Sequence, residues 1–253
     1  MLSDHFANRQ LTSAELEGFQ QNGYCHLAGL LKPAGIEQML KECMDAWAEE
    51  KGPYDPNSTW LKNALLVDIH HKSKLVRDYY FEGPLVEIAN QIKGATSQLT
   101  LKMRGNTSVF GWHQDNGYGE LAPYNATTCL AALEDNNAET GCLWVLPGSH
   151  KQGQIQTRCN AEDREKLGEV VVDVDESQAI PVPMKAGDCL LLGCWTLHKS
   201  EGNFSEDQDR RVLFLRYADA DAVEVYNDNR PRLGRLLSGS TIFPEVATFE
   251  SEL

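Results

Sequence analysis

The chain has 253 residues, of which 42% are hydrophobic and 24% are charged, a balance typical of a folded globular protein. Its formal net charge of −14 argues against a protein that binds nucleic acid by neutralising phosphates, and no apolar run approaches the roughly 20 residues needed to span a bilayer. The N-terminus lacks the basic and apolar regions of a secretory signal, so we expect a cytoplasmic protein that binds neither nucleic acid nor membranes.

Cysteine usage points the same way. The chain contains no Cys-x-x-Cys pair, and its seven cysteines stand at positions 25, 43, 129, 142, 159, 189 and 194. Several of them, such as Cys129 and Cys189, lie inside apolar runs. This pattern predicts reduced thiols in the core rather than a disulfide framework or a zinc site.

Residues 1–95 are predicted to form a mostly helical layer that covers a sheet. Thr12 and Glu15 form a capping-box pattern at the start of the first helix, and Gly23 can close that helix in a left-handed conformation. Gly52 and Gly94 are expected to end the second and the last helix. The predicted elements are helices over residues 12–21, 33–51, 75–80 and 84–92, and a short strand over residues 24–27.

Two adjacent histidines, His70 and His71, stand between these helices. A metal-binding histidine needs further ligands and an orienting partner. No acidic or cysteine ligand stands at useful spacing from this pair. A structural or surface role is therefore expected for both side chains.

From about residue 96 the pattern changes to short strands separated by turns. The run from Gln98 to Met103 alternates, with Gln98, Thr100 and Lys102 on one face. Many short strands with such turns indicate an all-β sandwich or barrel. The predicted strands cover residues 98–103, 109–113, 126–133, 142–146, 170–174, 180–182, 188–192 and 210–217. We expect a single domain over residues 1–253, with its β core at 96–220.

The C-terminal segment, residues 221–253, is basic within an acidic chain. It carries Arg230, Arg232 and Arg235 around a proline. These arginines could form a lid or reach an anionic substrate. A solvated tail or an interface segment is the favoured interpretation, because basic clusters are commonly just solvated.

The most informative short motif is the pair His113 and Asp115. On an extended strand, residues two apart point to the same face. An imidazole and a carboxylate on one face supply two ligands of a 2-His-1-carboxylate site for Fe(II) with open positions. The best candidate for the third ligand is His198, which follows the apolar run 189–192. A double-stranded β-helix, or jelly roll, would bring the three together.

Such an iron site leaves room for a chelating keto-acid and for dioxygen. The distal carboxylate of the keto-acid needs a bidentate cation, which is arginine's geometry. Arg210 and Arg211 begin the strand after His198, and they point to opposite faces, so at most one of them serves. Strand periodicity leaves that choice open. The hydroxyl of Ser200 could donate a hydrogen bond to the same carboxylate.

With these residues and motifs, the chain resembles the phytanoyl-CoA dioxygenase family of Fe(II)/2-oxoglutarate-dependent oxygenases. The resemblance spans residues 11 to about 217. It rests on an ordered set of motifs, namely the runs 112–115 and 141–151, Gly187-Asp188, the run 198–200 and the pair Arg210-Arg211. It implies a mainly β fold with flanking α-helices and a cupin-like, double-stranded β-helix (jelly-roll) core.

The resemblance also implies roles for individual residues. His113, Asp115 and His198 would bind Fe(II), and Arg210 would bind 2-oxoglutarate, with Arg211 as the alternative. Ser200 would contact 2-oxoglutarate as well, and Gln98 and Thr100 would line its pocket. Because the carboxylate ligand Asp115 leaves no vacancy for a halide, we expect hydroxylation or desaturation rather than halogenation.

The implied activity is hydroxylation of a small organic substrate by O2, with release of succinate and CO2. The alternatives are a zinc metallohydrolase on the same triad and a catalytically inactive jelly-roll binding protein. The zinc hydrolase needs no arginine for a keto-acid and gives no explanation for Ser200 and Arg210. Substrate identity and oligomeric state are not readable from the sequence.

Overall fold

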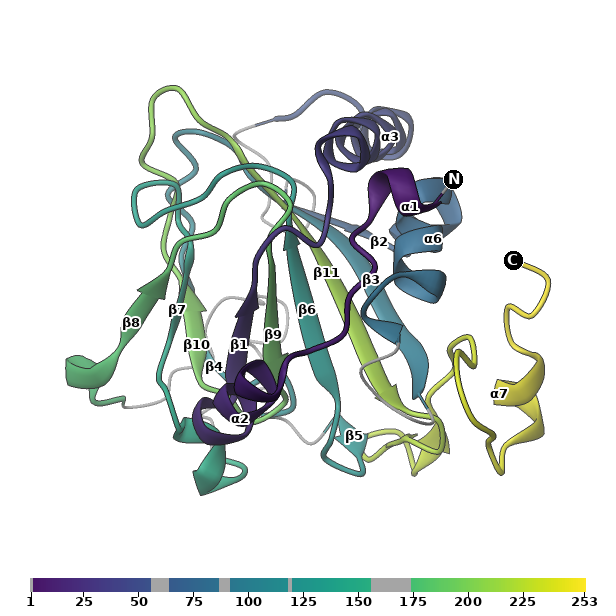
Figure 1. The fold of residues 1–253 in the computed structure, drawn as a ribbon. Helices are drawn as coiled ribbons and strands as arrows, with labels where there is room; N and C mark the ends of the chain where they lie inside the picture. Colours follow the sequence, from purple (N-terminus) through teal and green to yellow (C-terminus); the bar gives the residue numbers. More distant parts are fainter. Residues whose placement is uncertain (1, 56–63, 87–91, 118–119, 156–173) are drawn as a thin grey trace.

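The computed structural model describes residues 2–55, 64–86, 92–117, 120–155 and 174–253. Antiparallel strands form three sheets, and short helices flank them (Figure 1). Together they make a jelly roll with flanking helices, as the sequence predicts. The helices are α1 (Leu2–His5), α2 (Ser13–Asn22), α3 (Pro33–Lys51), α5 (Ile69–Lys72), α6 (Lys74–Glu82) and α7 (Pro244–Thr248).

The largest sheet has six strands. Their order across the sheet is β1 (Tyr24–Leu27), β9 (Cys189–Gly193), β6 (Thr127–Ala132), β11 (Arg210–Asp219), β3 (Ile92–Lys102) and β2 (Leu65–Val67). The helices α3 and α6 lie against its outer face (Figure 1). Leu99 and Leu101 of β3 pack there with Trp47 and Tyr79 from the helices. Burial of these side chains supplies much of the driving force for folding.

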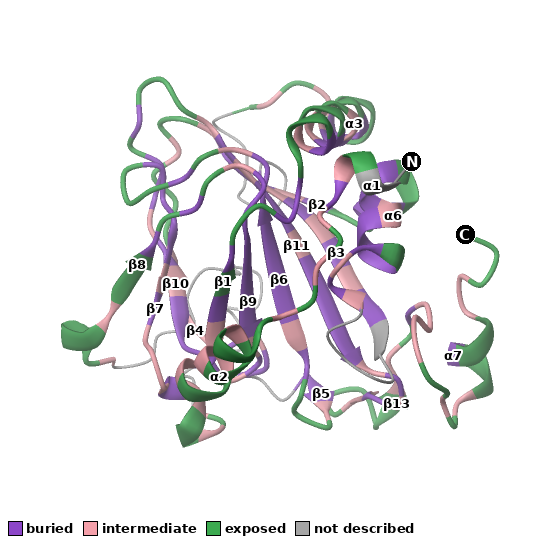
Figure 2. Ribbon diagram, in the orientation of Figure 1, coloured by how far each residue is buried: buried purple, intermediate pink, exposed green. Residues whose placement is uncertain are grey.

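The second sheet has four strands and closes the other side of the roll. Its order is β4 (Phe110–His113), β10 (His198–Ser200), β7 (Leu143–Val145) and β8 (Ile180–Val182). Leu130, Leu190 and Val212 from the large sheet form a buried cluster with Leu143 and Val145 from this one. Strands through both sheets are largely buried (Figure 2). A third, small sheet contains β13 (Arg230–Pro231), β12 (Val223–Glu224) and β5 (Leu121–Ala122).

The predicted start of the chain is confirmed in detail. Thr12 caps α2 through a complete capping box with Glu15, and Gly23 ends the helix at φ 81°. Pro33 begins α3, and Gly52 ends it. The predicted strand over 180–182 matches β8, and the other predicted strands in the described residues differ from the observed ones mainly at their ends. The predicted strand over 170–174 lies almost wholly outside the described residues.

Of the helix predicted over 84–92, residues 84–86 form a turn, residues 87–91 lie outside the described residues, and the C-terminal end is wrong. Ile92 and Gly94 belong to β3, where they pair with Asp219 and Tyr217 of β11. The long strand β11 extends the pairing of β3 upstream, and this tertiary partner outweighs the local helical pattern. Gly94 is needed there for close packing, since a Cβ atom would lie 2.9 Å from the Tyr80 ring.

The prediction of reduced cysteines is wrong for one pair. A disulfide joins Cys129 of β6 to Cys189 of β9, with their Cα atoms 6.2 Å apart. Cys129 stands opposite Leu191, so Cys189 lies two residues along on the same face of the adjacent strand. The sequence could not reveal this proximity because 60 residues separate the two. Four other cysteines are free and buried, namely Cys25, Cys43, Cys142 and Cys194.

Two of the three C-terminal arginines differ from the expectation of a solvated tail, whereas Arg230 is exposed. Arg232 is not solvated: it forms an ion pair with Glu224 and donates hydrogen bonds to the Ala95 carbonyl and the Thr96 hydroxyl. Arg235 lies over the Phe81 ring, 4.9 Å from its centroid. These contacts fasten the segment to the large sheet and its helical layer. In the described part of the chain, no helix is long and apolar enough to cross a membrane.

Candidate metal and co-substrate site

His113, Asp115 and His198 converge at one end of the roll. Their ligand atoms all lie within 4.8 Å of one another. His113 ends β4, His198 begins β10, and the two residues stand directly opposite each other in the strand pair. Asp115 lies in the turn just after β4. The pairing of β4 with β10 therefore brings together two histidines that lie far apart in the sequence.

Both histidine rings are held with their Nε2 atoms toward Asp115. The Nδ1 atom of His113 is 2.8 Å from the Gly111 carbonyl oxygen, and that of His198 is 3.0 Å from the Thr196 carbonyl oxygen. A carbonyl oxygen only accepts, so each Nδ1–H donates and each Nε2 keeps its lone pair for a metal. These contacts fit a metal-binding role.

The Asp115 carboxylate is oriented as well. The Thr128 hydroxyl donates to Asp115 Oδ2 at 2.5 Å. Asp115 Oδ1 lies 3.4 Å from His198 Nε2 and 3.9 Å from His113 Nε2. Adjacent ligands on an octahedral ion with bonds of about 2.1 Å lie about 3 Å apart. The donor set fits a divalent iron if the ion draws these atoms from 3.4 and 3.9 Å toward that spacing.

The three groups are buried, and they shift one another's protonation. Burial, followed by the charge on His198, lowers the pKa of His113 to about 3. Burial alone would raise the pKa of Asp115, but His198 and Arg216 lower it below its usual range. The site therefore holds an ionised carboxylate beside a neutral His113. Burial alone would lower the pKa of His198, but Asp115 raises it above its ordinary value, so a metal ion that binds there would displace the proton on His198 Nε2.

The side chains of Arg210 and Arg211 point to opposite faces of β11. Arg211 forms ion pairs with Glu134 and Asp209. Arg210 is only 3% exposed, and its Nε atom is buried without a hydrogen-bond partner. It pairs in register with Lys102 of β3. In the described part of the chain, Arg210 has no ion pair with a carboxylate, so it can receive one from a ligand.

Lys102 is a site residue whose role sequence reasoning missed. It is 3% exposed, and its Nζ donates to the Ser200 hydroxyl at 2.8 Å. Burial, followed by the charge on Arg210, lowers the pKa of Lys102 to about 6. Two neighbouring buried cations are costly unless an anion joins them. Strand alternation put Lys102 on the right face but gave no sign that Ser200 would reach it.

Gln98 and Thr100 lie on the same inward face of β3 as Lys102. They stand opposite Phe214 and Val212 of β11, and both are half-buried. Phe214 and Val212 belong to the apolar cluster between the two main sheets. On the inner face of the large sheet, the cationic pair Arg210 and Lys102 is therefore followed by the apolar side chains Val212 and Phe214.

A buried ion pair lies farther along β11 on the same face. Arg216 forms an ion pair with Glu120, and both residues are buried. Thr128, the partner of Asp115, stands opposite Arg216 in the pairing of β6 with β11. The triad therefore has charged neighbours that no sequence motif indicated.

Comparison with known proteins agrees with this architecture. A model of the phytanoyl-CoA dioxygenase (PhyH) family matches residues 19–212. Phytanoyl-CoA dioxygenase from Arabidopsis thaliana is 24% identical over 166 residues, which cover 64% of this chain and 58% of that protein. The chain thus spans less than two thirds of that relative. Methylphosphonate hydroxylase from Gimesia maris is 27% identical over 240 residues, covering 89% of this chain and 88% of that protein.

A solved structure shows the same fold. The non-haem alpha-ketoglutarate-dependent carbocyclase SnoK from nogalamycin biosynthesis superposes with a TM-score of 0.71. The match covers 91% of this chain and 94% of SnoK at 22% identity. The chain belongs to the phytanoyl-CoA dioxygenase family of Fe(II)- and 2-oxoglutarate-dependent oxygenases, as its sequence motifs predict.

Proposed function

We propose that this protein is an Fe(II)/2-oxoglutarate-dependent dioxygenase that hydroxylates a small organic substrate and releases succinate and CO2. One observation carries the proposal. Three convergent ligand atoms lie on the same roll as a buried arginine that has no carboxylate partner in the described residues. A zinc hydrolase would need the triad but would not need the arginine.

His113 Nε2, Asp115 Oδ1 and His198 Nε2 would hold the iron. When bound, the iron supplies the activation of O2 that is coupled to decarboxylation of 2-oxoglutarate and to oxidation of a substrate C–H bond. The chain's own part is to fix the ligands. The Gly111 and Thr196 carbonyls hold the two rings, and the Thr128 hydroxyl holds the carboxylate.

Arg210 would bind the distal carboxylate of 2-oxoglutarate. Its guanidinium offers two parallel donors, a geometry that matches a carboxylate. Ser200 would donate its hydroxyl to the same group, and Lys102 would add a second positive charge at 2.8 Å from Ser200 Oγ. Gln98 and Thr100 would line the adjacent wall. Arg211 is committed to Glu134 and Asp209, which supports the choice of Arg210.

The substrate would be a small molecule. The match with a relative named methylphosphonate hydroxylase covers 89% of this chain at 27% identity, which supports a small polar substrate. The net charge of −14 supports the absence of nucleic acid among the partners. The protein would bind no membrane either.

We also propose that residues 1–253 act as one domain in the cytoplasm. Contacts of Glu250 with His70 and of Arg232 with Ala95 link the C-terminal segment to the rest, which supports one domain. Four free buried cysteines support a reducing compartment, whereas the Cys129–Cys189 disulfide is unusual there. Counting thiols in protein quenched with acid directly from cells tests this assignment.

The proposed activity is tested first by spectroscopy without oxygen. Adding 2-oxoglutarate to the anaerobic Fe(II) protein should produce a visible charge-transfer band, and Arg210→Ala should weaken it. Succinate release across a panel of small substrates, with mass analysis for a gain of one oxygen atom, then identifies the reaction. Zinc-dependent hydrolysis without 2-oxoglutarate, or no metal uptake at all, would overturn the proposal.

A further inference from the structure

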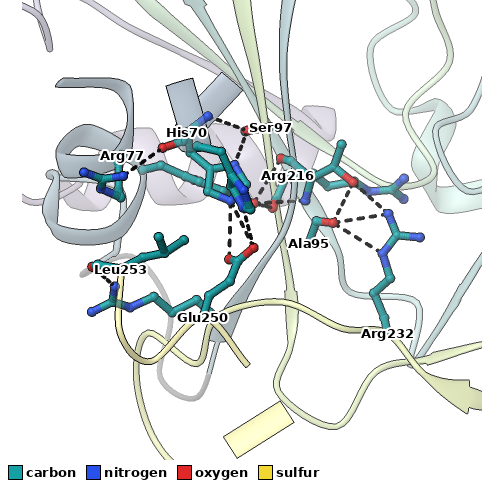
Figure 3. Close-up of polar contacts among 12 residues, drawn as sticks. His70, Arg77, Ala95, Ser97, Arg216, Arg232, Glu250 and Leu253 are labelled. Carbon is teal, nitrogen blue, oxygen red and sulfur yellow. Dashed lines mark hydrogen bonds and ion pairs between the residues drawn. The ribbon is translucent and has the colours of Figure 1, made fainter. Parts of the chain in front are cut away.

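A second group of two histidines and one carboxylate lies against the large sheet. His70 and His71 come from the short helix α5, and Glu250 comes from the turn after α7. Figure 3 shows Glu250 facing His70. His71 Nε2 is 2.7 Å from Glu250 Oε1, and His70 Nε2 is 3.3 Å from each oxygen of the same carboxylate. No acidic residue stands at useful spacing from this histidine pair in the sequence, but the fold brings one to it. Glu250 lies 179 residues from His71, so only the fold reveals it.

The His70 ring is fixed in one orientation. It is 5% exposed, and its centroid lies 5.7 Å from that of Tyr80 and 5.3 Å from that of Phe81. Its Nδ1 lies 2.5 Å from the Ser97 hydroxyl oxygen, which directs Nε2 at Glu250 (Figure 3). A hydroxyl can accept as well as donate, so Ser97 can accept from Nδ1–H while Nε2 presents a lone pair. An orienting partner of this kind is typical of metal-binding histidines.

Glu250 is a carboxylate held in an unusual backbone conformation. Its φ is +52°, which is uncommon for a residue other than glycine, and its side chain is 12% exposed. Within the described residues, its only ion pairs are with His70 and His71. The group is therefore a carboxylate that faces two imidazoles.

The spacing of the donor atoms suits a small divalent ion. Two donors on a tetrahedral zinc, with bonds of about 2.0–2.1 Å, lie about 3.3 Å apart. The distance from His70 Nε2 to Glu250 already has this value, and that from His71 Nε2 needs an opening from 2.7 Å. His71 is 44% exposed at its side chain, so it is free to make this movement.

We propose that His70, His71 and Glu250 bind a divalent transition metal of the zinc class. Two imidazoles and one carboxylate leave a fourth position for water or a small anion. His70, His71 and Glu250 line a cavity of about 480 Å³. The residues of the proposed iron site, His113, Asp115 and His198, do not line it. The bound ion fastens the C-terminal segment to α5. This site is separate from the proposed iron site and does not depend on the proposed reaction.

The test uses the full-length chain with the first triad disabled, as His113→Ala/Asp115→Ala. Calorimetry with zinc, and the visible spectrum with Co(II), should both show one metal per chain. In that background, Glu250→Gln and His71→Ala should each weaken binding at least about tenfold. Matched controls are Lys72→Ala, on the same helix, and His26→Ala, whose ring instead pairs with Asp188. Both controls should bind as the parent does.

A second readout follows the C-terminal segment directly. Zinc should slow limited proteolysis near residue 250 in the parent but not in Glu250→Gln. If the disabled background does not fold, the wild-type chain serves instead and should bind two zinc ions, against one in His71→Ala. A parent that binds no metal at the second site overturns the proposal, and so does binding that Glu250→Gln and His71→Ala both leave unchanged. Either result would leave a metal-free histidine–glutamate ion pair, and the proposed oxygenase activity would be untouched.

Discussion

The described part of the molecule contains two clusters with the same donors, and they differ in how those donors are held. In the first, His113 and His198 face each other across a strand pair, and backbone carbonyls orient both rings. In the second, His70 and His71 are neighbours on one short helix, and a hydroxyl orients only His70. The first is buried between sheets, and the second lies at the edge, under the C-terminal segment. The same set of ligand side chains is therefore held rigidly in the first cluster and can adjust its positions in the second.

Removing one carboxylate from each cluster should separate their roles most strongly. Asp115→Ala should lower the rate of succinate release by more than about a hundredfold, because loss of an orienting partner alone costs up to that much in a metal site. Glu250→Ala is the matched change and should leave the rate near wild type. Equal rates in the two variants would contradict the assignment of the catalytic metal to the first cluster.

The two adjacent arginines provide the next comparison. Arg210→Ala should raise the KM for 2-oxoglutarate by about 10- to 100-fold, because a hydrogen-bonded pair with a charged group is worth about 1.5–3 kcal/mol. Arg211→Ala removes an outer ion pair with Glu134 and should change KM less than about twofold. Steady-state kinetics with varied 2-oxoglutarate measures both. A larger effect at Arg211 would reverse the assignment.

Orienting hydroxyls should act on their own cluster only. Thr128→Val removes the donor to Asp115 and should weaken iron binding about tenfold, whereas Ser97→Ala should weaken metal binding at His70 by a similar factor. Metal titrations of both variants, with both ions, give four affinities. If Thr128→Val altered the second cluster as much as the first, the effect would be a general loss of structure rather than of orientation.

Lys102 gives the smallest effect, the uptake of at most one proton. Its pKa is lowered to about 6, so at about pH 8 the amine is neutral. A dianion beside it stabilises the charged form and raises the pKa, so 2-oxoglutarate binding should take up close to one proton at a pH between 6 and the raised pKa, and none well below pH 6. Calorimetry in buffers of different ionisation enthalpy measures this uptake. Lys102→Met should abolish it, and buffer-independent heats in the wild type would refute it.

Much of the fold was predictable because local signals and tertiary contacts agree. The Thr12 capping box and the alternation from Gln98 are local features, and both appear as expected. The predicted helix end at Gly94 failed because β11 recruits that stretch as a strand. Such recruitment depends on a partner more than a hundred residues away, which no local pattern contains.

The site divides in the same manner. His113 and Asp115 stand close in sequence, and a family motif points to His198, so all three were predictable. Lys102, Thr128 and Glu250 were not assigned roles, because their partners come from strands and turns distant in sequence. The choice between Arg210 and Arg211 needed the structure to show which one faces inward.

The direct opposition of His113 and His198 has a consequence for how the chain folds. A slip of β10 by one residue would bring Leu197 or Lys199 opposite His113 and would turn His198 to the other face. Neither replacement offers a neutral nitrogen donor at neutral pH. An iron ion bound at the proposed site would therefore stabilise only the correctly aligned strand pair, so the metal would select the strand register as well as support the reaction.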